Sequence, residues 1–350
     1  MALMHLYAIV PTDGNLELGV AGVDGNEVRA VAHGGFAALF SRSEALDYRA
    51  LDRERLLRCL LAHQRVVETA MREHAVLPVK FGTLLPDEAL AREALAQGED
   101  VFREGLRQLA GCVQMEVVAI WRLADVLQEI AHEDEVARLV SKAESASTGG
   151  STDGRIAVGR MVHALLEQRR AALRDALVQA FREIGGDLIV NPNLDDSVVL
   201  NLAMLVDDSK RAILDRSLDM LDGTFAPKLN FRCVGPLPPY SFATVEIEKP
   251  AFEEVDAARQ LLGLGEAADA AEIKAAYYRL AGASHPDIDP DNPEAQERMS
   301  RITEAYKLLT RYAECVARCR GGSEVAVSSF DRQSVENALL ISVRRQESQA

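Results

Sequence analysis

The first 122 residues alternate between short apolar runs and helical patterns, which predicts an α+β unit. Residues 4–10 (MHLYAIV) favour a strand that ends at Pro11, and short strands joined by glycine turns follow up to Phe40. Apolar side chains then recur at helical spacing over 51–74, which predicts an amphipathic helix. The other elements expected in this unit are a helix over 86–97, a helix over 99–110 and a strand over 116–121.

Residues 123–250 carry strands and helices in the order of a split βαβ motif, which predicts a ferredoxin-like α+β unit. A polar loop rich in glycine and serine precedes a long amphipathic helix over about 155–183. The run GPLPPY at 235–240 predicts a rigid turn, because each proline fixes its φ angle. The remaining elements expected here are helices over 124–140 and 208–222 and strands over 187–190, 198–206, 228–234 and 242–248.

The pattern becomes helical again over 251–320, which predicts a small third module, and a tail follows over 321–350. Residues 322–330 of the tail favour a strand. Its end has two open interpretations, an amphipathic helix within 331–350 or a strand over 339–343. The expected fold class is therefore α+β, with two α+β units followed by a small helical module.

Composition and charge narrow the class of protein. The chain has 350 residues, of which 48% are hydrophobic and 27% charged, as in ordinary globular proteins. A net charge of −15 argues against nucleic-acid binding, which needs a basic face for phosphates. No apolar run reaches the length of a membrane span, and no signal peptide is recognised. Five scattered cysteines favour reduced thiols in the cytoplasm.

Five ordered segments resemble the gas vesicle L/F family over about residues 4–248. They are YAIV at 7–10, LPVKFGT at 77–83, GRIAVGR at 154–160, NLAMLV at 201–206 and GPLPPYSF at 235–242. The resemblance implies a non-enzymatic accessory protein of gas vesicle formation that contacts the small, hydrophobic major shell protein and other gas vesicle proteins. A shell monomer that polymerises through apolar and strand surfaces is prone to aggregate, and a partner with accessible strand edges could hold it.

Two of these segments supply candidate contacts with the shell protein. In LPVKFGT the candidates are Lys80 and Phe81, and the alternative is that the segment only shapes a strand end with Phe81 in the core. In GPLPPYSF the candidates are Leu237 and Tyr240, as an exposed apolar ridge. The alternative there is a rigid connection that sets strand register, since prolines reduce the entropy of the unfolded chain.

A helical hairpin is predicted near the C-terminus, around a polar loop that holds His285, Pro286 and Asp287. Its two apolar stripes are Ile273, Ala276, Tyr277 and Leu280 before the loop, and Ile302, Ala305, Tyr306 and Leu309 after it. This arrangement is similar to the J domain of DnaJ-type cochaperones. The resemblance implies that the loop contacts a DnaK-type chaperone, together with Lys274 and Arg279 of the preceding helix.

The charge of this hairpin departs from the pattern of active J domains, whose second helix is strongly basic. Residues 272–312 carry six basic and seven acidic side chains, which leaves a net charge of −1. Electrostatic steering toward an acidic chaperone is expected to be weak. Two interpretations stay open, a module that stimulates the chaperone's ATP hydrolysis and one that only docks.

Candidate chemistry elsewhere is sparse. Cys315 and Cys319 lie four residues apart, but a structural zinc site needs about four ligands. Acidic pairs such as Asp207 and Asp208 are explained by capping roles. We therefore expect no enzyme, no cofactor and no metal, and a location in the cytoplasm or at the gas vesicle. Two alternative functions stay open, a minor structural component of the vesicle and a general J-domain cochaperone.

Overall fold

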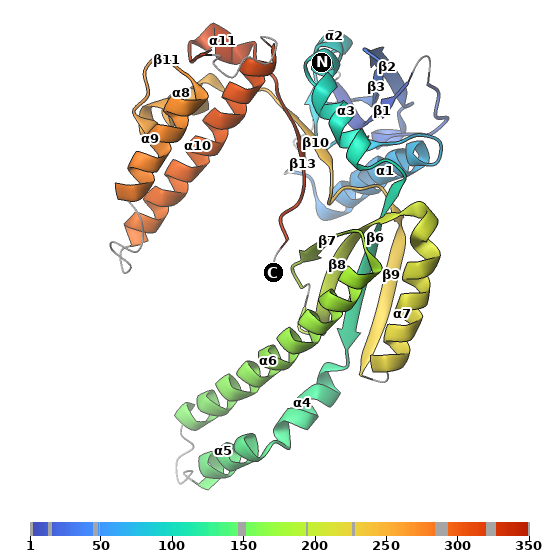
Figure 1. Cartoon of the computed structure of the whole chain (residues 1–350), viewed down its shortest axis with the longest axis vertical. Helices are drawn as coiled ribbons and strands as arrows, with labels where there is room; N and C mark the ends of the chain where they lie inside the picture. Colours follow the sequence, from blue (N-terminus) through green and yellow to red (C-terminus); the bar gives the residue numbers. More distant parts are fainter. Residues whose placement is uncertain are drawn as a thin grey trace. The chain divides into compact units, whose positions relative to one another are not determined.

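The computed structural model describes residues 3–12, 16–44, 48, 50–145, 152–193, 195–225, 228–283, 293–319 and 327–348. Contacts divide the chain into two compact units (Figure 1): Met1–Gln108 with Thr244–Arg344, and Leu109–Ala243 with Arg345–Ala350. The first unit is thus discontinuous in the sequence. The bounds of the four consecutive segments predicted above stay a prediction.

The N-terminal part of the first unit contains an antiparallel sheet and three helices. Its elements are β1 (Leu3–Pro11), η1 (Val23–Gly25), β2 (Arg29–His33), β3 (Phe36–Ser43), α1 (Arg53–Met71), β4 (Leu77–Pro78), β5 (Leu84–Leu85), α2 (Glu88–Gln97) and α3 (Glu99–Gln108). The strand order is β2-β3-β1-β4, and β5 also pairs with β1. Seven successive residues of β1 are buried, so both faces of this strand are covered.

Local signals explain where the helices of this part begin. The side chain of Asp52 accepts a hydrogen bond from the backbone N–H of Arg55, which caps α1. Asp87 caps α2 in the same way through the N–H of Leu90. The three helices lie where the apolar periodicity predicts them.

The C-terminal tail returns to the first unit as a strand. β13 (Leu340–Arg344) pairs antiparallel with β10 (Thr244–Glu248), so of the two interpretations of the tail the strand is the one found. β10 in turn meets the N-terminal part, because Val79 forms a parallel bridge with Val245 and the N–H of Lys80 donates to the carbonyl of Val245 at 2.9 Å. The module between β10 and β13 therefore has both ends in one strand pair.

That module has its own core, which includes residues of the tail. Its elements are α8 (Phe252–Leu262), β11 (Ala267–Ala268), α9 (Ala270–Ala283), α10 (Pro293–Cys319), β12 (Ser328–Ser329) and α11 (Arg332–Glu336). The predicted stripes meet, since Ile273 and Ile302 share the core and the rings of Tyr277 and Tyr306 stack at 4.3 Å. Phe330 and Val335 of the tail are buried in the same core. Residues 328–340 of the tail thus contribute to the core of the module.

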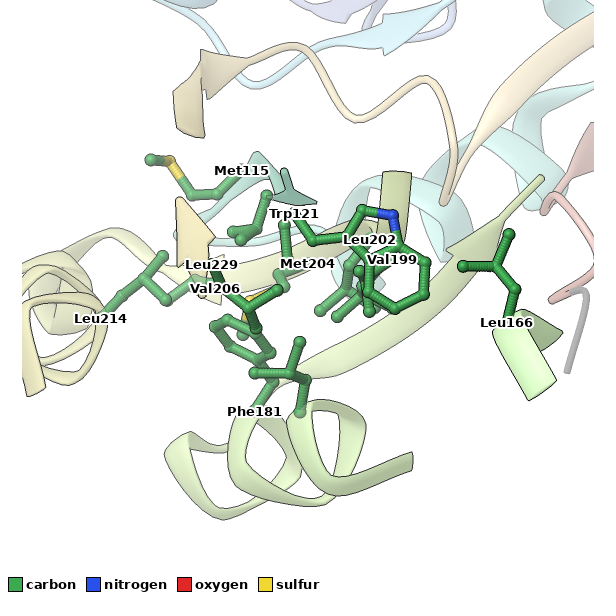
Figure 2. Packing of buried hydrophobic residues seen from close by; sticks show 14 of the residues in the cluster. Met115, Trp121, Leu166, Phe181, Val199, Leu202, Met204, Val206, Leu214 and Leu229 are labelled. Carbon is green, nitrogen blue, oxygen red and sulfur yellow. The ribbon is translucent and has the colours of Figure 1, made fainter. Parts of the chain in front are cut away.

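The second unit is a ferredoxin-like sandwich of one sheet and its helices, as the sequence predicts. Its elements are β6 (Cys112–Trp121), α4 (Leu123–Ala131), α5 (Asp134–Ser145), α6 (Thr152–Ile184), β7 (Asp187–Asn191), β8 (Val198–Asp207), η2 (Asp208–Lys210), α7 (Arg211–Phe225) and β9 (Leu229–Leu237). The order β7-β8-β6-β9 is antiparallel throughout. Phe181 rises from α6 toward Met204 and Val206 of β8 (Figure 2), and all three are buried.

Four details of this unit differ from the sequence prediction. The strand predicted over 242–248 was assigned to this unit, whereas β10 pairs with β13 in the first unit. The strand predicted over 116–121 was assigned to the first unit, whereas β6 pairs with β8 and β9 in the second. Its partners lie more than 70 residues downstream, where no local pattern identifies them. The helix predicted over 124–140 is two helices, α4 and α5. The first part of the predicted turn, 235–237, continues strand β9.

Candidate functional site

Lys80, a predicted contact of the shell protein, lies in a cluster of ion pairs in the first unit. Its Nζ is 2.9 Å from Oε1 of Glu246 and 3.7 Å from Oε1 of Glu248. Both carboxylates extend from one face of β10, because strand residues two apart share a face. Nε of Arg344 lies 2.6 Å from Oε2 of Glu246, and a guanidinium nitrogen of Arg311 lies 2.8 Å from Glu248. We call these five residues the β10 charge cluster.

The β10 charge cluster joins four parts of the chain. Lys80 follows β4, the two glutamates belong to β10, Arg344 ends β13, and Arg311 belongs to α10. Burial alone would raise the pKa of Glu248, but the hydrogen bond and charge of Arg311 outweigh it and the pKa is lowered. The role of Lys80 visible in the structure is therefore to neutralise acidic side chains, and its contact with a shell protein stays a prediction.

Phe81, the neighbouring candidate, packs in a cluster of rings beneath β1. Its ring centroid lies 4.7 Å from Tyr48, 5.6 Å from His5 and 5.5 Å from His63. The imidazole of His5 is hydrogen-bonded to the hydroxyl of Tyr48 at 2.8 Å and to Nδ1 of His63 at 3.0 Å. The ring of Phe81 is partly buried, which agrees with its core role in the alternative reading.

The two histidines of this cluster are held neutral. Burial lowers the pKa of His5 to about 3, and the neighbouring charge of His63 adds to that effect. Burial also lowers the pKa of His63 to about 4. At neutral pH the cluster therefore acts as an uncharged, hydrogen-bonded part of the core.

The proline-rich turn that follows β9 belongs to the second unit and is fixed by buried polar contacts. The side-chain amide of Gln114 accepts from the backbone N–H of Ser241 at 3.0 Å and donates to its hydroxyl at 3.2 Å. Pro238 and Pro239 are buried, while Leu237 and Tyr240 are half-buried. These contacts support a connection of fixed geometry, and the binding role of Leu237 and Tyr240 stays a prediction.

The predicted chaperone surface is described only in part. His285, Pro286 and Asp287 lie outside the described residues. Lys274 and Arg279 are both exposed on α9, and the guanidinium of Arg279 donates to the carbonyl of Leu262 at 3.2 Å. Lys274 is thus the basic group of α9 that points to solvent without such a contact in the described chain.

Sequence reasoning selected Lys80 but missed the residues around it. Glu246 and Glu248 alternate with apolar residues in the run TVEIE, and Glu246 is buried. A buried glutamate is rare unless it is paired, so this alternation is the signal that could have found the cluster. Within the described residues no group of three or more His, Cys, Asp or Glu side chains could hold a metal ion. None of the described helices has the length and apolar character of a membrane span.

Comparisons with known proteins match both parts of the chain. Residues 3–244 match the family model "Gas vesicle synthesis protein GvpL/GvpF", and residues 259–315 match the DnaJ domain model. Gas vesicle protein F of Streptomyces sp. (strain CB03234) is 30% identical over 65% of this chain and 92% of its own length. Gas vesicle protein L of the same strain is 27% identical over 73% of this chain and 98% of its own length.

Two further matches concern the fold and the helical module. The crystal structure of the gas vesicle protein GvpF from Anabaena sp. PCC7120 has a TM-score of 0.56 and 21% identity. It covers 69% of this chain and 98% of that chain, so the fold is shared. The chaperone protein DnaJ of Halothermothrix orenii is 49% identical over 51 residues, which are 15% of this chain and 14% of that protein. Both resemblances identified in the sequence are thereby confirmed.

Proposed function

Because the chain belongs to the gas vesicle synthesis protein GvpL/GvpF family, we propose that it assists gas vesicle assembly by binding the major shell protein before that protein polymerises. We further propose that its DnaJ domain recruits a DnaK-type chaperone to the bound shell protein. The protein acts in the cytoplasm and at the growing vesicle, and no catalytic step is assigned to it. The observation that carries the proposal is that one chain contains both a family match over 3–244 and a DnaJ domain.

The way the module is attached supports a joint role for the two parts. A domain carried on a flexible tail would act independently of the rest of the chain. Here β10 and β13 pair at the two ends of the module, and Arg311 of α10 reaches Glu248 of β10. A chaperone bound to the module is therefore kept near any client that the first unit holds, at a high effective concentration.

Co-purification tests the first part of the proposal. The full chain with an affinity tag is co-expressed with the major shell protein, and we expect the shell protein to be retained at micromolar concentration. No retention would contradict the proposal. Retention of this chain on finished vesicles after a urea wash would instead favour a structural component of the vesicle.

ATP hydrolysis by a purified DnaK-type chaperone tests the second part. The full chain should stimulate hydrolysis, and His285→Gln should abolish the stimulation and lower vesicle yield. His163→Gln is the matched control, because His163 is exposed on α6 of the other unit. An unchanged yield with His285→Gln would reduce the module to a scaffold. Stimulation without any effect on vesicles would favour a general cochaperone.

The geometry of α9 sharpens this test. Arg279 is bound to the carbonyl of Leu262, so Lys274 carries the exposed positive charge of α9 toward an acidic partner. Lys274→Glu should weaken stimulation most at low salt, because the interaction is electrostatic. Lys307→Glu, at an exposed position of α10, is the matched control.

A further inference from the structure

The first unit has an open strand edge with a second, irregular segment facing it. β2 is the outer strand of its sheet and pairs only with β3 in the described chain. Every second residue of β2 therefore directs its backbone N–H and C=O away from β3. Residues 16–21 line the same groove as this edge and are irregular chain, in which Gly19 has a φ of 60°.

The two segments are joined at one end and separate at the other. The N–H of Val28 donates to the carbonyl of Val20 at 3.4 Å, and Ala21 forms an antiparallel bridge with Glu27. Beyond that point no backbone hydrogen bond between described residues connects 16–19 with β2. The ladder begins and then stops at Gly19, whose positive φ turns the chain, and this leaves the outer edge of β2 unpaired.

The space between them is a groove of about 900 Å³, which we call the β2 slot. It is lined by residues 16–21, 25 and 27–32 of this region and by Arg92 of α2. A residue in a β-sheet occupies roughly 160 Å³, from a rise of about 3.3 Å, a strand spacing of about 4.8 Å and a sheet thickness of about 10 Å. The β2 slot therefore has room for about five or six extended residues, close to the length of β2.

Walls on both sides restrict what can enter the β2 slot. An edge strand of a folded sheet has a neighbour of its own, which would collide with residues 16–20. The same collision excludes β2 of a second copy, because that copy brings its own residues 16–20. The occupant must be a single extended segment with both edges free.

The side chains of the β2 slot favour an apolar occupant without acidic side chains. Leu16, Leu18 and Val20 contribute partly buried apolar surface, and Ala30 and Ala32 leave space for larger side chains. The charged groups at the rim already form pairs: Arg29 lies 2.8 Å from Glu27, and Arg92 lies 3.0 Å from Glu88. Glu17, which is exposed and also lines the slot, forms no ion pair with another described residue, so the rim disfavours an acidic peptide.

We propose that the β2 slot binds a single extended, apolar segment without acidic side chains, from an unassembled strand-forming polypeptide, by adding a strand to the open edge of β2. Under the proposed function, on which this identification rests, that polypeptide is the shell protein before it polymerises. A strand already paired within a vesicle wall has no free edges, so the β2 slot selects the unassembled form. Binding by strand addition takes its affinity from main-chain hydrogen bonds and its selectivity from alternate side chains.

The test uses the full chain and an eight-residue peptide of alternating valine and threonine. Hydrogen exchange should slow in residues 16–20 and 29–32 when the peptide binds, and the same peptide N-methylated along one edge should not bind. Ala32→Glu should weaken binding at least tenfold, because Ala32 lines the β2 slot and is exposed, so the fold is kept. His33→Glu is the matched control, since His33 is exposed on β2 but does not line the slot.

The outcomes separate this proposal from the proposed function. If wild type and Ala32→Glu bind the peptide equally well and also retain the shell protein equally well, the proposal for the β2 slot is wrong and the proposed function is unaffected. If Ala32→Glu abolishes peptide binding but the wild-type chain does not retain the shell protein, the β2 slot is supported and the proposed function is contradicted. Protection of 29–32 that grows with protein concentration and needs no peptide would assign the slot to a second copy and overturn the proposal.

Discussion

Replacing Glu246 by glutamine tests whether the β10 charge cluster fastens the last strand of the first unit. The Glu246 side chain is 9% exposed, whereas those of Lys80 and Arg344 are 54% and 52% exposed. Glu246→Gln keeps the shape of the side chain and removes its charge. The change therefore weakens two contacts of one carboxylate without creating a cavity.

The expected magnitude follows from these exposures. The Lys80 contact is a hydrogen bond and the Arg344 contact an ion pair. A hydrogen bond to a charged group contributes about 1.5–3 kcal/mol when it is shielded from water. Because both cations are half exposed and screened, each contact is reduced to about 0.5–1 kcal/mol. Only the Arg344 contact joins β13 to β10, because Lys80 follows β4. The pairing of β13 with β10 should therefore lose about 0.5–1 kcal/mol, equivalent to a roughly 2–5-fold change in its opening equilibrium.

Hydrogen exchange of the intact protein at pH 7 measures this opening locally. A local readout is needed because a chain with two units does not unfold in one two-state step. Amides of β13 should exchange roughly 2–5-fold faster in Glu246→Gln, as the conversion of about 0.5–1 kcal/mol requires. Glu27→Gln is the matched control, because Glu27 pairs with Arg29 at the surface and should leave β13 unchanged. Unchanged exchange of β13 in Glu246→Gln would refute the reasoning.

Two further predictions concern buried residues of each unit. Phe181→Ala should destabilise the second unit by about 3–5 kcal/mol in urea unfolding, because removal of a fully buried aromatic side chain leaves a cavity. Met220→Ala is the control and should change stability little, because Met220 is 67% exposed. Equal effects of the two substitutions would contradict the packing described. The first unit should lose stability as pH falls from about 6.5 to about 4, because His5 and His63 take up protons in the unfolded chain before the folded one. His63→Gln should flatten this part of the stability curve measured by circular dichroism, and an unchanged curve would show that other groups cause it.

Much of the fold could be predicted from the sequence because its elements have strong local periods. The long helix α6 and the strand run of β8 are recognisable without any partner, and their order already indicates a ferredoxin-like sheet. The assignment of β6 and the return of β13 could not be predicted. Both depend on pairing between strands distant in sequence. The alternation of apolar and polar residues within a strand does not identify the strand with which it pairs.

The same limit applies to the candidate site. Lys80 stands out in a family motif, but its acidic partner Glu246 is 166 residues away in the chain. The β2 slot has no sequence signature at all, because residues 16–21 carry no strong period and β2 is short. Its existence depends on where two ordinary segments separate, which only the three-dimensional structure shows.

The strand pair that closes the first unit has a thermodynamic consequence. Glu248 and Leu340 are partners across the β10–β13 ladder, so the pair is a β-hairpin whose loop is the whole helical module, 249–339. An unstructured loop of that length would cost about 3 kcal/mol more to close than a four-residue turn, since closure entropy grows with the logarithm of length. A folded module removes most of this penalty by bringing the two ends of the loop together. Melting of the module therefore weakens the hairpin, so the stability of the β10–β13 pair depends on whether the module is folded.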